Sequence, residues 1–171
     1  NTMLPPDIRV YKCETQREDF NARFETVSKA YEYVIVNRPF ADPLLRNFAW
    51  HYPVKLDIEK MKKAASIIQG KHDFASFCAA GSSAKTTVRN LMELTVRADG
   101  DIITVRAKAD GFLYNMVRII TGTLVEVGLG KRSPEEIQEI IEAKDRRMAG
   151  HTAPPYGLYL AEVYYGENLP G

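Results

Sequence analysis

The pattern of apolar and polar positions predicts a set of strands joined by short turns. Ala30–Asn37 is rich in β-branched and aromatic residues, which is typical of a strand. Val88–Arg97 and Ile102–Ala109 flank a turn containing Asp99 and Gly100, and an Asp-Gly pair is a strong hairpin signal. Alternation in the second of these strands predicts one buried face and one exposed face. Further strands are expected at Ile8–Cys13 and Tyr156–Tyr165, outside this hairpin.

Helical spacing and cap residues predict three helices. The apolar residues Ile58, Met61, Ala64, Ala65 and Ile68 recur at helical spacing between an N-terminal cap, Asp57, and a C-terminal cap residue, Gly70. Ser133–Glu136 has the form of a capping box and opens a helix that runs to about Lys144. The segment Gly111–Gly128 is apolar on nearly every side and is expected to form one buried helix.

These elements define the expected fold class. Hairpin-joined strands with helices between them favour an α+β fold: a largely antiparallel (mixed) sheet with helices packed on one face. No repeat or linker divides the chain, so residues 1–171 are expected to form a single domain.

Arg118 stands out within the apolar segment. A guanidinium keeps its charge at any working pH, so a buried one needs an acidic or phosphate partner. The positions three and four residues away hold no carboxylate, and Glu126 is two turns further on. The partner of Arg118 must therefore come from another segment, another chain or a ligand.

Composition narrows the choice of function class only slightly. The chain is 45% hydrophobic with a net charge of +1, so any basic surface for nucleic acid must be local. Cys13 and Cys78 lack metal-ligand spacing and are expected to be free thiols in a reducing cytoplasm. Neither a signal peptide nor a membrane-spanning run is evident, which favours a soluble cytoplasmic protein without a membrane partner.

The candidate chemistry lies in cations interleaved with aromatic residues. No phosphate-binding glycine loop, nucleophile elbow or metal-ligand spacing is present. Cations near expected strand ends and loops could contact phosphates while aromatic rings stack on bases, or they could be solvated charges beside core aromatics. The cations are Arg23, Lys29, Arg38, Arg46, Lys85, Arg89, Arg97, Arg106 and Lys108.

Several stretches resemble the tRNA pseudouridine synthase A family, and they occur in that family's order from about residue 4 to residue 165. They are Phe20–Phe24 with Ser28–Tyr33, Lys71–Phe77, Lys85–Asn90, Gly111–Gly122, Ala143–Arg146 and Ala153–Leu160. The resemblance implies a pseudouridine synthase catalytic-domain type of fold. It also implies an isomerase that converts uridine to pseudouridine in the anticodon stem-loop of tRNA, without cofactor or metal. Members of the family work as homodimers with tRNA lying across both subunits.

The same resemblance assigns roles to individual residues. Tyr31 matches the tyrosine that stacks on the target uracil, and Arg118 matches the arginine that pairs with the catalytic Asp. Leu158 matches an apolar residue near the flipped base. Arg23, Lys85 and Arg89 are expected phosphate contacts; the alternative for each of these residues is ordinary packing or solvated surface.

The family's catalytic Asp motif, Arg-Thr-Asp-x-Gly-Val-His, does not occur in this sequence, and all nine Asp residues lie in other contexts. We therefore expect this chain to be the C-terminal part of the enzyme, inactive alone, with residues 1–20 joining it to an N-terminal half. Two alternatives stay open: a stand-alone RNA-binding module without catalysis, and a purely structural dimerisation domain.

Overall fold

A computed structural model describes residues 1–166 and has the α+β architecture that the pattern predicts. The strands are β1 (Thr26–Val36), β2 (Trp50–His51), β3 (Gly70–Asp73), β4 (Val88–Asp99), β5 (Ile102–Ala109) and β6 (Leu158–Tyr165). The α-helices are α1 (Ile58–Ile68), α2 (Met116–Gly128) and α3 (Glu136–Ala143), and two short 3₁₀ helices cover Ala75–Phe77 and Pro155–Gly157.

All the strands belong to one mixed sheet. Its order is β2-β1-β5-β4-β3, with β6 paired to β1, and only the β1–β2 pair is parallel. The long strand β1 lies at the centre: β5 pairs with one of its edges, while β6 and β2 share the other. Tyr31 is thereby opposite Ala107 on one side and Leu160 on the other, and its neighbour Tyr33 is opposite Leu158.

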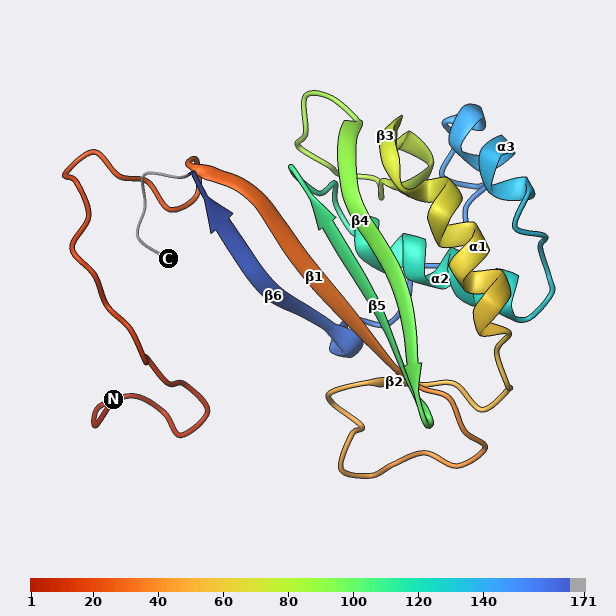
Figure 1. Cartoon of the computed structure of the whole chain (residues 1–171), viewed down its shortest axis with the longest axis horizontal. Helices are drawn as coiled ribbons and strands as arrows, with labels where there is room; N and C mark the ends of the chain where they lie inside the picture. The colour runs from red at the N-terminus through yellow and green to blue at the C-terminus, as the bar shows by residue number, and fades with distance from the viewer. Residues whose placement is uncertain (167–171) are drawn as a thin grey trace.

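The helices gather on one side of the domain, with α1 packed on β4 and α2 packed on β1 (Figure 1). The strand β5 has the predicted alternation, since Ile103, Val105, Ala107 and Ala109 are buried and the residues between them are partly exposed. The core therefore lies between the sheet and the helices, and the other sheet face is left for polar side chains.

The predicted N-terminal caps of α1 and α3 are present. The Asp57 carboxylate accepts a hydrogen bond from the Lys60 amide at 3.1 Å. At the other end of α1 the cap residue is Gln69, in an extended conformation, and Gly70 begins β3 with a φ of +125°. Ser133 and Glu136 exchange the two hydrogen bonds of a capping box. These local signals locate α1 and α3 because each satisfies backbone groups that a helix end leaves unpaired.

One predicted helix was wrong at its start, and one predicted strand does not form. Residues 111–115 are not helical, because Asn115 adopts a left-handed conformation (φ +59°) and α2 begins only at Met116. Ile8–Cys13 forms no strand; it is exposed and pairs with no other strand of the described chain. The short strands β2 and β3 were missed, since they are too brief for an alternating pattern to identify them.

The first 25 residues run beside the sheet rather than within it (Figure 1). The Phe20 ring meets the Tyr165 ring edge-on at 5.5 Å, which ties this segment to the end of β6. Residues 1–20 contain no helix or strand, and their expected joining role stays a prediction.

Candidate active site

A pocket of about 410 Å³ lies where β1, α2 and β6 meet. Its walls come from the central strand, the β5–α2 connection, the first turn of α2, the loop before β4 and the first residue of β6. Tyr31, Arg118 and Leu158 all line it. The other lining residues are Gly81, Ser82, Ser83, Ala84, Phe112, Leu113, Tyr114, Asn115, Met116 and Val117. Three residues singled out from separate sequence segments thus share one cavity.

Tyr31 contributes an aromatic wall to the pocket. Its ring meets Phe112 edge-on, with the centroids 5.0 Å apart and the planes at 86°. No hydrogen bond of the Tyr31 hydroxyl occurs within residues 1–166. The ring is half-buried and lines the pocket, so it offers an aromatic surface to a planar ligand there.

Arg118 projects from the first turn of α2 and binds only neutral oxygens. Its Nε donates to the Ala153 carbonyl at 2.7 Å, and its Nη1 donates to Asn115 Oδ1 at 3.0 Å. It forms no ion pair with any carboxylate in the described chain, and no acidic residue is among those lining the pocket. As expected, a partner of Arg118 comes from another segment, since the Ala153 carbonyl accepts its hydrogen bond. This partner is neutral, however, so it does not compensate the charge of the guanidinium.

Tyr33, next but one to Tyr31, has a structural role. Burial, and then the neighbouring Tyr156, raise the pKa of the Tyr33 hydroxyl well above its usual range, although the charge of Arg118 acts in the opposite direction. The hydroxyl donates to the Pro154 carbonyl at 2.6 Å. Tyr33 therefore stays neutral and anchors the loop that leads to Leu158.

The three expected phosphate contacts are not in the pocket wall. Lys85 is exposed and directly follows the lining residue Ala84, so it lies at the rim. Arg89 is half-buried, and its Nη1 donates to the carbonyls of Thr86 and Val88 at 3.0 and 2.6 Å. Arg23 is exposed on the segment before β1, 5.7 Å from the centre of the Phe24 ring.

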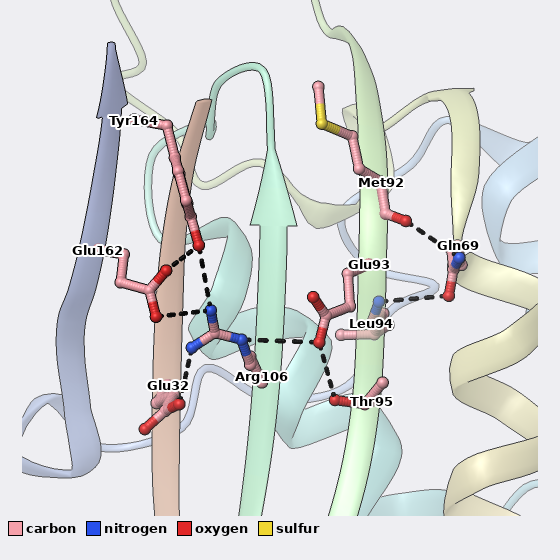
Figure 2. Close-up of polar contacts among 9 residues, drawn as sticks. All are labelled: Glu32, Gln69, Met92, Glu93, Leu94, Thr95, Arg106, Glu162 and Tyr164. Carbon is pink, nitrogen blue, oxygen red and sulfur yellow. Dashed lines mark hydrogen bonds and ion pairs between the residues drawn. The ribbon is translucent and has the colours of Figure 1, made fainter. Parts of the chain in front are cut away.

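One cation on the opposite face of the sheet, Arg106, is compensated by carboxylates. Adjacent strand residues point to opposite faces, so Arg106 and Glu32, which pair across β5 and β1, face away from Tyr31 and Ala107. Figure 2 shows Arg106 among three carboxylates, at 2.8 Å from Glu32, 3.6 Å from Glu93 and 3.0 Å from Glu162. This face has no surplus positive charge around Arg106 with which to attract phosphates.

Sequence reasoning missed Asn115 as a site residue. It lines the pocket, binds Arg118 and adopts the left-handed conformation that Asn tolerates better than most residues. The available signal was a polar residue inside the apolar segment Gly111–Gly128, but the whole segment was assigned to one helix.

The described part of the chain contains neither a metal-binding cluster nor a membrane-spanning helix. Residues 1–166 contain no group of three or more His, Cys, Asp or Glu side chains arranged to hold a metal ion. Both cysteines are free thiols, as expected. Across the same residues, every helix is too short or too polar to cross a bilayer.

Comparison with known proteins gives the class of this domain. The sequence profile of the tRNA pseudouridine synthases matches residues 64–166, a range that includes Arg118 and Leu158. The chain belongs to the tRNA pseudouridine synthase family.

Within the family, the similar relatives bear the name tRNA pseudouridine synthase A. The protein from a Thermoanaerobacter species is 48% identical over 165 residues, which cover 96% of this chain and 68% of the relative. The Acetivibrio thermocellus protein is also 48% identical, with the same coverage. The Bacillus subtilis protein is 45% identical, over 96% of this chain and 67% of its own length.

Proposed function

We propose that this chain forms the uridine-binding part of a tRNA pseudouridine synthase that acts on the anticodon stem-loop. The observation that carries the proposal is the convergence of Tyr31, Arg118 and Leu158 on one pocket. The relatives' shared name, tRNA pseudouridine synthase A, supports the same reaction and substrate.

The pocket suits a base that has left the helical stack. An enzyme acting on a nucleobase must extrude it and hold it between aromatic or apolar surfaces. The Tyr31 ring and the Leu158 side chain provide such surfaces, and Ser82 and Asn115 provide polar groups for the edge of a uracil. This wall composition favours a planar, partly polar ligand.

The reaction is an internal rearrangement that needs no co-reactant. The C1′–N1 bond breaks, the uracil turns within the pocket and a C1′–C5 bond forms; C5 then loses its proton and N1 gains one. A carboxylate near C1′ must stay ionised throughout. A guanidinium beside a carboxylate favours the charged form, and Arg118 is the cation of this pocket.

That carboxylate is the part of the site that we assign to a segment outside this sequence. Arg118 binds two neutral oxygens, and the pocket walls built by residues 1–166 contain no acid. The Asp of the Arg-Thr-Asp motif expected from the family resemblance would give Arg118 an acidic partner and would add a carboxylate to the pocket. The chain alone is then catalytically silent, and residues 1–20 lead toward the half that carries the motif.

The phosphate contacts lie outside the pocket. We assign the phosphate beside a flipped nucleotide to Lys85, which is exposed and follows the lining residue Ala84, and further phosphates along the RNA to Arg23 and Arg89. The enzyme is expected to be a cytoplasmic homodimer that holds tRNA between two copies. Sedimentation of the protein with and without tRNA tests the dimer.

The test combines this chain with the part of the Thermoanaerobacter relative that its alignment leaves uncovered. Tritium release from tRNA labelled at uridine C5 is expected only when both parts are present. A stand-alone RNA-binding module would instead bind anticodon stem-loop RNA, yet stay silent after the second part is added.

A further inference from the structure

The segment Ala149–Ala153 lies against α2 in closer contact than side chains would allow. A Cβ atom added to Gly122 would lie 1.9 Å from the His151 carbonyl oxygen. A Cβ atom on Gly150 would lie 2.7 Å from the Thr123 Cα. Both glycines are therefore required for this contact, because main chain meets main chain on both sides of it.

Hydrogen bonds fix the segment along the helix at three points. The Gly150 amide donates to Thr123 Oγ1 at 2.9 Å, and the His151 amide donates to the Glu126 carboxylate at 3.2 Å. The Ala153 amide donates to the Arg118 carbonyl at 3.1 Å. The bond to Thr123 is buried, whereas the bond to Glu126 is exposed.

Thr123 is oriented to serve as an acceptor. Its hydroxyl donates to the Ile119 carbonyl at 2.8 Å, so its lone pairs remain for the Gly150 amide. The side chain is completely buried. Loss of its oxygen would leave the Gly150 amide buried without a partner, which is costly.

The position of the segment also sets the orientation of Arg118. The carbonyl of Ala153 accepts the Arg118 Nε hydrogen bond at 2.7 Å, so the position of Ala153 is one of the two contacts that orient the guanidinium, with Asn115 as the other. We propose that Thr123, which lies outside the pocket wall, is a positioning residue for Arg118: it anchors Gly150 and thereby holds the Ala153 carbonyl in place. The catalytic meaning of this role rests on the proposed function, but its geometry does not.

Thr121 provides a matched control. It is also completely buried in α2, and its hydroxyl donates to the Val117 carbonyl at 2.9 Å in the same way. Its hydroxyl makes no hydrogen bond with Ala149–Ala153 in the described structure. Replacing either threonine with valine removes one hydroxyl at nearly constant volume, but only Thr123→Val removes a hydrogen bond that holds the segment Ala149–Ala153.

The experiment follows the Arg118 Nε–H proton by NMR in the whole chain. Thr123→Val is expected to speed its exchange with solvent by about tenfold or more, the equivalent of about 1.4 kcal/mol or more of lost protection. Thr121→Val should change it less than about twofold, and Thr123→Ser should preserve the slow exchange because serine keeps the oxygen. Equal effects of the two valines, or unchanged exchange in Thr123→Val, would overturn the proposal.

A second pair of variants covers the case in which Thr123→Val does not fold. Thr123→Ser and Thr123→Ala are both smaller than threonine, but only alanine lacks the acceptor. Fast exchange of the Arg118 Nε–H proton in Thr123→Ala but not in Thr123→Ser supports the role of Thr123 as an anchor. Fast exchange in both variants refutes that role.

Kinetics then separate this inference from the proposed function. In the complemented enzyme, Thr123→Val should lower kcat by about tenfold to a hundredfold with little change in KM, as expected for a misplaced group. A complemented wild type without turnover would defeat the proposed function and leave the exchange result intact. A change confined to KM would count against positioning.

Discussion

Arg118 and Ala153 are joined by two hydrogen bonds that run in opposite directions. The Arg118 side chain donates to the Ala153 carbonyl at 2.7 Å, and the Ala153 amide donates to the Arg118 carbonyl at 3.1 Å. This reciprocal pair fixes a cation at the pocket without neutralising it.

Replacing Arg118 should affect chemistry far more than folding. Arg118→Met removes an uncompensated charge and two hydrogen bonds to neutral oxygens, so opposing effects should keep the change in unfolding free energy within about 1 kcal/mol. Arg106→Met is the control, because it leaves Glu32, Glu93 and Glu162 together without their cation. It should destabilise the chain by about 1 to 3 kcal/mol in urea unfolding. Equal losses of unfolding free energy in Arg118→Met and Arg106→Met would mean that Arg118 is an ordinary structural cation.

Gly122→Ala should severely destabilise the protein. Its Cβ would meet the His151 carbonyl, which is main chain and cannot move aside as a side chain can. We expect a loss of about 3 kcal/mol or more in unfolding free energy. In Gly128→Ala, also in α2, the new Cβ would meet only side-chain atoms, at 3.0 Å from Met61 Cγ and Sδ and 3.3 Å from Leu56 Cβ, so the loss should be at least about 2 kcal/mol smaller than for Gly122→Ala. Similar losses at both positions would contradict the close contact with Ala149–Ala153.

Glu126 should make the stability of the protein depend on pH, because its carboxylate accepts a hydrogen bond from His151 in the segment Ala149–Ala153. Burial alone would raise the pKa of Glu126, but hydrogen bonds from Arg132 and His151 outweigh burial and hold the pKa below its ordinary value of 4.5. A depressed carboxyl pKa stabilises the fold above the unfolded-state value, and this contribution is lost as the pH falls through the folded-state pKa. Glu126→Gln should therefore be less stable than wild type at pH 7, and the difference should shrink below about pH 4.

Urea unfolding at a series of pH values measures that difference. Glu139→Gln is the control, since Glu139 is exposed on α3 and has no hydrogen bond or ion pair in the described structure. A Glu126→Gln difference that stays constant down to pH 3 would rule out the proposed hydrogen-bonded carboxylate.

Lys85 should contribute a phosphate contact. Lys85→Gln is expected to weaken anticodon stem-loop binding at low salt and to reduce the slope of log K against log salt by about 1. Lys63→Gln, an exposed change on α1 where the lysine pairs with Glu135, should leave the slope unaltered. Filter binding at several salt concentrations checks this, and an unchanged slope for Lys85→Gln would remove Lys85 from the RNA contact.

Local signals in the sequence were enough to predict much of the fold. Short-range chemistry decides these features. The Asp57 cap and the Ser133–Glu136 box provide hydrogen-bond partners for backbone amides at helix starts, and Gly100 supplies the positive φ of the Asp99-Gly100 turn. The start of α2 could not be read in this way. Apolar residues before Met116 continue the helical pattern, but the left-handed Asn115 and the packing of Phe112 on Tyr31 depend on the folded sheet.

The site was predictable only in part, for a similar reason. Family resemblance named Tyr31, Arg118 and Leu158, and sheet register and helix packing then brought them to one pocket. The anchoring of Arg118 by Ala153 joins positions 35 residues apart through a glycine-mediated contact, which no local pattern encodes.

The most direct test of the account is tritium release from tRNA labelled at uridine C5, measured for this chain alone and with the uncovered part of the Thermoanaerobacter relative added. The account predicts no release by the chain alone, release by the combined parts and loss of that release in Arg118→Met. Turnover by the isolated chain, or full activity of the combined enzyme without Arg118, would contradict it.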